Sequence, residues 1–359
     1  MIILLAKACL GLFGLLMLPW ACAPSPTATL GTPDSARSER WQRWARTDIE
    51  YLDGPEAEGR QTATRGFTRV VAYVSGQMRQ AQLQPVLVDE YRLQYAALLR
   101  RSTEVSVQLI GKDTTNALHG DAFLITGTPQ ELRTAGAMPS LPEVDWLQWS
   151  EDIHTREGNT SRWSVNITVD ERVSTAPMHV VGMLPGSQPV RRDSVVLVLA
   201  PLDGDGLKGS ESWTDGSDLS LPSAALLYTM RQMAEYQRTW ALYTHSTLFG
   251  LLSGTRDDCQ GPTQFIRHLP WERSLVSKVI VVSMQMDRAC DWNALFRESF
   301  PENSGPEVVF LQGYAPYDAL GATEFGSWRR RASLMQSGVL DEATTEVLRL
   351  ARILLEHVP

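Results

Sequence analysis

Lysine is scarce in this chain: only four of the 33 basic residues are lysine, and the others are arginine. Acidic residues outnumber basic ones by 41 to 33, which gives a formal net charge of −8, and the charges are spread along the sequence rather than gathered in a tail. Proteins that bind nucleic acid concentrate positive charge in a stripe or patch. The composition therefore excludes nucleic acid as a partner.

The signatures of several common sites are also missing. The sequence has no CxxC pair and no Cys/His spacing of a structural zinc site. It has no glycine-rich phosphate-binding loop, and Ser253 lacks the Gly-x-Ser-x-Gly frame of a nucleophile elbow. These absences argue against a zinc finger, a nucleotide-binding protein and a serine hydrolase of that type.

A segment near the N-terminus, Leu10–Leu18 (LGLFGLLML), is almost entirely apolar and follows Lys7, but it is too short to span a membrane comfortably. Such a segment is typical of a signal peptide. Cys22 directly follows Ala21, which predicts a lipoprotein signal with Cys22 as the acylated residue. Because Pro19 stands where leucine is usual, plain secretion and an uncleaved anchor remain alternatives. We expect an exported protein of the bacterial cell envelope, periplasmic or outer-membrane associated, with its lipid anchor in the membrane.

The predicted secondary structure differs between successive parts of the chain. Amphipathic helices are expected at Ser38–Leu52 and Arg65–Leu83. Alternation of apolar and polar residues predicts half-buried strands around 105–109 and 163–169. We expect five parts: a signal peptide at 1–21, a flexible tether rich in Pro, Ser and Thr at 22–37, the N-terminal helices of the main domain at 38–100, a reduced strand-rich insert at 101–175 and the core of the main domain at 176–359.

From residue 176 onward, apolar runs alternate with amphipathic helices. Buried strands are expected at Val195–Ala200, Leu248–Leu252, Val279–Met286 and Val308–Leu311, and helices at Pro222–Tyr236 and Asp341–Val358. Strands that are apolar on both faces are typical of a largely parallel sheet covered on each side. In such a sheet, functional residues lie in the loops at the carboxyl ends of the strands.

Two segments carry a resemblance to a known family. Asp53–Gly66 (DGPEAEGRQTATRG) contains the step Glu58-Gly59-Arg60, and His179–Asp203 (HVVGMLPGSQPVRRDSVVLVLAPLD) runs through a Leu-Pro-Gly turn into a buried strand. Both resemble segments of the secreted and periplasmic zinc aminopeptidases of clan MH, of the leucyl-aminopeptidase-like, aminopeptidase S/Y type. The resemblance covers residues 50–84 and 176–359, and the stretch between them resembles a reduced form of a domain often inserted there. It implies a three-layer α/β sandwich with a central, largely parallel mixed sheet, the zinc-aminopeptidase/phosphorylase-like fold.

In that family, two zinc ions are held by about five oxygen and imidazole ligands. Carried over by position, three carboxylates of this ligand set are kept: Asp203, Asp218 and Asp287. Pro201, which has no donor atom, stands at the first histidine position. The Glu-Glu pair of catalytic base and ligand falls on Thr255-Arg256, and no histidine occurs between His268 and His357 to supply the last ligand. The resemblance therefore implies a degenerate member of the family.

The remaining residues favour a site without metal. Zinc prefers nitrogen and sulfur donors, which the three carboxylates do not offer. Arg256 adds a permanent positive charge, and we expect it to replace the metal by pairing with one of those carboxylates. A slip of two residues in the loop would instead make Asp257 and Asp258 the acidic pair. That alternative restores a base and one ligand, with zinc as the cofactor, or Ca²⁺ in an all-oxygen site.

Cys259 and Cys290 each follow the end of a predicted parallel strand. Such ends lie on one rim of the sheet, and an oxidising compartment allows thiols to pair. We therefore expect a disulfide across this rim, with two separate buried cysteines as the alternative.

Three functions are compatible with these residues. The favoured hypothesis is a non-catalytic family member (a pseudoenzyme) that is tethered in the envelope, needs no cofactor, and binds a peptide or an envelope protein. The alternatives are an active metallopeptidase, an exopeptidase with a rearranged carboxylate site, and a purely structural envelope lipoprotein.

Overall fold

The computed structural model describes residues 35–87, 90–110, 115–118, 162–174, 177–208, 211–214, 219–269, 271–284, 290–300, 306–314, 329–330 and 337–359. The predicted signal peptide, the acylation site Cys22 and the carboxylates Asp218 and Asp287 lie outside these ranges. Trp41–Pro359 form one compact unit. In the part of the chain described, no helix is both long enough and apolar enough to cross a membrane.

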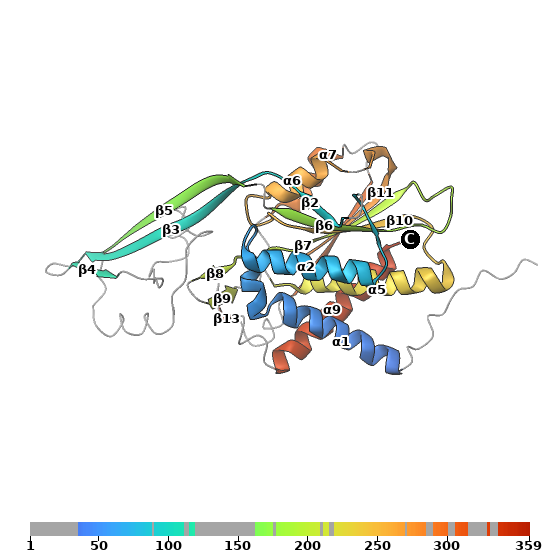
Figure 1. Cartoon of the computed structure of the whole chain (residues 1–359), viewed down its shortest axis with the longest axis horizontal. Coiled ribbons are helices and arrows are strands. Elements are labelled where there is room, and N and C mark those ends of the chain that lie inside the picture. The colour runs from blue at the N-terminus through green and yellow to red at the C-terminus, as the bar shows by residue number, and fades with distance from the viewer. Residues whose placement is uncertain are drawn as a thin grey trace, which may run out of the picture. The chain divides into compact units, whose positions relative to one another are not determined.

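A seven-stranded mixed sheet forms the centre of this unit (Figure 1). Its strand order is β1 (Gln84–Pro85), β6 (Met178–Leu184), β10 (Ser246–Leu252), β7 (Val195–Pro201), β11 (Val276–Met284) and β12 (Glu307–Gly313), and β2 (Arg92–Gln94) also pairs with β6. The last four strands of this order run parallel, whereas β6 pairs antiparallel with its neighbours. The expectation of a largely parallel mixed sheet is confirmed.

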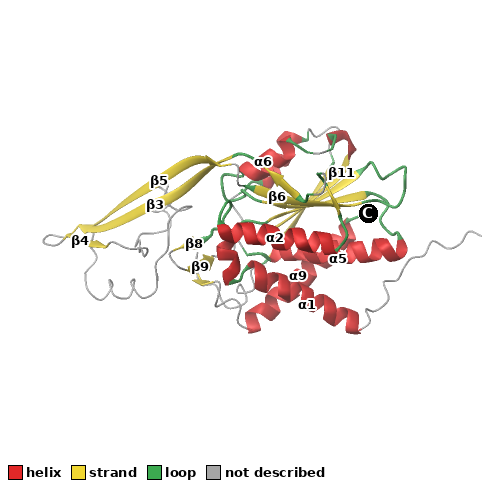
Figure 2. Cartoon of the chain, in the orientation of Figure 1, coloured by secondary structure: helices red, strands yellow, loops and turns green. Residues whose placement is uncertain are grey.

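Alternate residues of β7 face two separate cores. Val196, Val198 and Ala200 belong to one core, and Val195, Leu197 and Leu199 to the other. The first core packs against α1 (Ser35–Leu52), α2 (Arg65–Gln80), α5 (Leu221–Trp240) and α9 (Ser337–His357), and the second against α6 (Gln260–Arg267) and α7 (Trp292–Ser299). Figure 2 shows helices on both sides of the sheet. This is the predicted three-layer sandwich, and it explains why the strand reads as an uninterrupted apolar run.

The two N-terminal helices form where the sequence predicts them. In α2, the Thr64 side chain caps the helix by accepting a hydrogen bond from the Phe67 backbone N–H. The helix ends at Gln80 rather than at Leu83, because Gln82 adopts a left-handed φ of 62°. The short 3-10 helix η1 (Pro55–Arg60) lies between α1 and α2, and a second one, η2 (Arg273–Leu275), precedes β11.

The expected strand-rich insert contains a second sheet. Its antiparallel strands β4 (Thr115–Leu118), β3 (Ala97–Ile110) and β5 (Arg162–Ser174) are ordered β4-β3-β5. The predicted boundary between residues 100 and 101 falls within β3. A third sheet joins β13 (Arg329–Arg330), β9 (Glu211–Thr214) and β8 (Leu207–Lys208).

Every buried apolar residue in the described part of the chain lies between Trp41 and Val358. A chain that begins at Ser35 therefore retains both cores and the sheet between them.

Candidate functional site

The candidate site lies at the carboxyl ends of β7 and β10. In the register of these parallel strands Leu252 is opposite Pro201, so both strands end at the same rim of the sheet. The loop after β7 then approaches the loop after β10, where the Leu202 backbone N–H donates to the Leu252 carbonyl at 2.7 Å. This contact brings Asp203 and Thr255 together, although 52 residues separate them in sequence.

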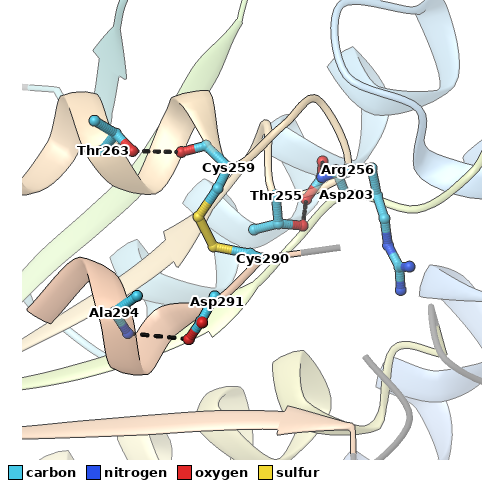
Figure 3. The surroundings of a disulfide bond; sticks show 8 residues. All are labelled: Asp203, Thr255, Arg256, Cys259, Thr263, Cys290, Asp291 and Ala294. Carbon is cyan, nitrogen blue, oxygen red and sulfur yellow. Dashed lines mark hydrogen bonds between the residues drawn. A yellow bond between two sulfur atoms is a disulfide. The ribbon is translucent and has the colours of Figure 1, made fainter. Parts of the chain in front are cut away.

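Asp203 is a buried carboxylate, 3% exposed, surrounded by hydrogen-bond donors. The Thr255 hydroxyl donates to its Oδ1 at 2.5 Å, as Figure 3 shows. Its Oδ2 accepts from the Thr62 hydroxyl at 3.1 Å and from the Arg256 backbone N–H at 3.2 Å. Thr62 in turn accepts the Gly254 N–H at 3.1 Å. Three uncharged donors thus replace the water that this carboxylate would have around it in solution.

These contacts bear on whether a zinc ion could bind at this rim. Both carboxylate oxygens of Asp203 accept hydrogen bonds from groups held in the fold, and the carbonyl of Pro201 accepts one from the Ser223 hydroxyl. Thr255, which the sequence resemblance predicts at a glutamate position, is a hydrogen-bond donor to Asp203. In the ranges that the structure describes, no three His, Cys, Asp or Glu residues are grouped to hold a metal ion. The described residues of the rim therefore do not fit a zinc pair.

Arg256 divides its interactions between two aspartates. Its backbone N–H is bound to Asp203, whereas its side chain runs away from that carboxylate in Figure 3. The Arg256 Nε lies 3.8 Å from Asp205 Oδ1, and the side chain is 15% exposed. The Arg256 side chain is thus partly buried beside Asp205, which was not among the carboxylates expected to pair with it. Asp218 and Asp287, the other two carboxylates predicted to pair with Arg256, lie outside the described residues.

The alternative acidic pair lies just beyond Arg256. The Asp257 carbonyl accepts the Gln260 backbone N–H at 3.1 Å, and Asp258 is exposed with a left-handed φ of 52°. Both residues belong to the turn that leads into α6. Whether they act on a substrate remains a prediction.

The predicted disulfide between Cys259 and Cys290 is confirmed (Figure 3). Their Cα atoms are 4.8 Å apart, within the range that a disulfide can bridge. Cys259 precedes α6, and Cys290 precedes Asp291, whose side chain caps α7 by accepting the Ala294 N–H at 3.0 Å. The bond therefore links the segments after β10 and β11 to each other at the rim.

Three residues beside the rim form a cluster that sequence reasoning missed. The Tyr95 hydroxyl lies 3.0 Å from Ser253 Oγ, and the Tyr95 ring stacks on the His179 ring with their centroids 4.4 Å apart. His179 Nδ1 accepts the Ser253 backbone N–H at 3.2 Å, which requires a neutral imidazole at that nitrogen. Burial lowers the pKa of His179 to about 3, opposed by the Gly261 backbone. His179 is therefore a buried, neutral residue that packs against Tyr95.

Residues of Asp53–Gly66, one of the two segments that resemble the zinc aminopeptidases, support the loop after β7. Arg60, which is fully buried, forms an ion pair with Asp53 and donates from Nε to the Leu202 carbonyl at 3.1 Å. Asp53 Oδ2 accepts from the Ser220 hydroxyl at 2.6 Å and from the Ser220 N–H at 3.1 Å, at the start of α5. Glu58 accepts the Gly66 N–H at 3.0 Å. Arg60 thus holds the loop after β7 in place, and Asp53 connects Arg60 to the start of α5.

No family model matches this chain, and no curated protein matches it. Solved structures of similar fold include a zinc aminopeptidase from Bacillus subtilis (11% identity, 85% of this chain and 94% of that one, TM-score 0.43). They also include a family M28 peptidase precursor from Shewanella amazonensis (10%, 68% and 72%, TM-score 0.44) and a glutaminyl cyclase from Porphyromonas gingivalis (10%, 88% and 98%, TM-score 0.45). At this level the likeness concerns the fold and transfers neither activity nor ligands to this chain.

Proposed function

We propose that this chain is a non-catalytic relative of the zinc aminopeptidases that binds a peptide or a protein partner in the cell envelope. The observation that carries the proposal is the set of hydrogen bonds around Asp203. By resemblance, this residue stands where the family has a zinc ligand. In this chain its two oxygens accept from Thr62, Thr255 and the backbone of Arg256.

The same positions argue against the family's chemistry. Metal-assisted peptide hydrolysis needs a cation to activate water and a carboxylate to take up its proton. By resemblance, Thr255 stands at the position of that base, and its hydroxyl donates a hydrogen bond to Asp203. Pro201 offers no imidazole, and Arg256 places a positive charge 3.8 Å from Asp205. The rim is therefore suited to holding two loops together rather than to activating water.

A peptidase assay directly tests the proposed loss of catalysis. The chain from Ser35 would be assayed with a panel of aminoacyl p-nitroanilides in the presence of zinc. A variant carrying Thr255→Glu and Arg256→Glu, which restores the acidic pair, serves as the matched comparison. We expect no turnover above a blank by the natural chain. Turnover that is abolished by Asp257→Asn or Asp258→Asn would instead establish the rearranged metallopeptidase.

Peptide selection tests the proposed binding of a peptide or protein partner. The immobilised chain would be offered a random peptide library, and enriched sequences would be measured for affinity in solution. We expect saturable binding that Arg256→Glu weakens, because the variant reverses the charge at the rim. Absence of any enriched peptide, together with absence of turnover, would favour the purely structural envelope protein.

A further inference from the structure

Two loops meet at the edge of the sheet opposite the candidate site, where the parallel strands begin. The loop of residues 185–194 leads into β7, and that of residues 241–245 leads into β10. The Ser187 backbone N–H donates to the Tyr243 carbonyl at 2.9 Å. The side chain of Gln237 bridges both loops, because its Nε2 donates to the Pro185 carbonyl at 3.0 Å and its Oε1 accepts the Tyr243 N–H at 2.8 Å. The two loops thus form one continuous surface.

Apolar side chains stand out from this surface into solvent. Val190 is 94% exposed, Trp240 67% and Leu242 46%. They are three of the seven large apolar residues that are exposed in the described part of the chain. Ala241, with a φ of 50°, ends α5 between Trp240 and Leu242. Single exposed apolar residues are ordinary, but several on two joined loops indicate a contact surface.

The charges around these residues are mainly positive, although the whole chain is acidic. Arg191 and Arg192 directly follow Val190 and are exposed. Arg238, also exposed, donates to the Ala81 carbonyl at 2.9 Å, which places the end of α2 and its Arg79 at the same end of the unit. These four arginines lie in segments that also carry the acidic residues Asp193 and Glu235.

The point where the chain enters the compact unit lies at this same end. Trp41, the first residue of the unit, packs edge-on against Tyr236 with ring centroids 6.2 Å apart. Tyr236 precedes Trp240 by about one helical turn. The predicted tether and its acylation site Cys22 precede Trp41 in the sequence.

We propose that the surface formed by Val190, Arg191, Arg192, Trp240 and Leu242 docks on an anionic phospholipid bilayer. Tryptophan is favoured at the level of lipid headgroups, where its ring is partly buried and its N–H can stay hydrated. Arginine side chains close to the bilayer are attracted to anionic headgroups. The aliphatic side chains add apolar area to this contact. This inference concerns the folded unit and does not depend on the loss of catalysis or on acylation of Cys22.

Docking in this way would direct the candidate site away from the membrane. β7 runs from this surface at Val195 to the rim at Pro201, and its seven residues span about 20 Å. The loops that carry Asp203 and Arg256 would then be open to a partner from the aqueous side.

Vesicle co-sedimentation tests the proposal with the chain from Ser35, which lacks the apolar N-terminal segment. Vesicles of equal parts phosphatidylglycerol and phosphatidylcholine would be compared with vesicles of phosphatidylcholine alone. We expect binding to the anionic vesicles that weakens as salt is raised. Arg191→Gln with Arg192→Gln should lower the partition coefficient roughly 30-fold, since each arginine near the surface contributes about fivefold. Arg65→Gln with Arg297→Gln, an equal charge change at exposed positions elsewhere, should leave the partition coefficient unchanged.

The apolar part of the contact has its own pair of variants. Trp240→Ser should weaken binding at both low and high salt, whereas Tyr314→Ser, at another exposed aromatic residue, should not. Circular dichroism melting of each variant would verify that it is folded. Equal binding to neutral and anionic vesicles, no binding to either, or equal losses in the patch and control variants would each overturn the proposal.

Discussion

The contact between Thr255 and Asp203 gives the sharpest test of how the rim is held. Replacing Thr255 by valine keeps the shape of the side chain but removes the donor that lies 2.5 Å from Oδ1. A hydrogen bond to a charged group contributes about 1.5–3 kcal/mol, and a buried group left without its partner loses that amount. Since Asp203 is 3% exposed, water cannot readily take the place of the hydroxyl. We therefore expect Thr255→Val to lower the free energy of unfolding by about 2 kcal/mol.

Urea unfolding at neutral pH measures this change, and Thr263→Val is the matched control. The Thr263 hydroxyl donates to the Cys259 carbonyl at 2.8 Å, a bond within one helical turn to a neutral acceptor that lies at the same rim (Figure 3). Its removal should cost at most about 1 kcal/mol, as for an ordinary neutral hydrogen bond. A Thr255→Val variant no less stable than the Thr263→Val control would refute the reasoning about Asp203.

The remaining predictions concern the groups that support the rim. Replacing both Cys259 and Cys290 by serine should lower the free energy of unfolding by about 3–4 kcal/mol, since the bond closes a loop with a separation of 31 residues; an unchanged urea midpoint relative to the oxidised chain would contradict this. Arg60→Met should cost about 3–5 kcal/mol in urea unfolding, because it leaves Asp53 buried without its ion-pair partner, and a loss below about 1 kcal/mol would argue against a structural role. The neutral form of His179 is favoured by folding, so its contribution to stability is complete above the unfolded pKa of 6.5 and declines as the pH falls from there towards 3. Between pH 6.5 and 5 the chain should lose about 1–2 kcal/mol that a His179→Gln variant does not lose, measured by urea unfolding at each pH.

Much of the framework could be predicted from sequence because it depends on burial. The run Val195–Ala200 is apolar at every position since helices cover both faces of β7, and its short length and valine content favour a central strand. The disulfide could also be predicted, from the common direction of the parallel strands. Parallel strands end on one rim, so cysteines that follow β10 and β11 can meet there even though their sequence neighbourhoods show no shared motif.

The contacts of the rim could not be predicted, because they depend on the register of loops in three dimensions. Thr62 reaches Asp203 across 141 residues, and nothing in its neighbourhood marks it as a partner of a buried carboxylate. Arg60 would ordinarily be expected at the surface, yet it is fully buried. The charge of Arg256 was evident from sequence but the direction of its side chain was not, and the aspartate beside its guanidinium is Asp205. Side-chain direction at a loop is set by the whole rim and leaves no periodic signal.

Zinc binding tests the central claim most directly. The chain from Ser35 would be purified without chelator, its zinc content measured by mass spectrometry, and zinc then titrated by calorimetry beside an Arg256→Glu variant. The account predicts no tightly bound zinc in the natural chain, because donors already occupy Asp203 and a guanidinium lies at the rim. Stoichiometric binding of two zinc ions by the natural chain would contradict it, and would return Asp257 and Asp258 to the place of the acidic pair.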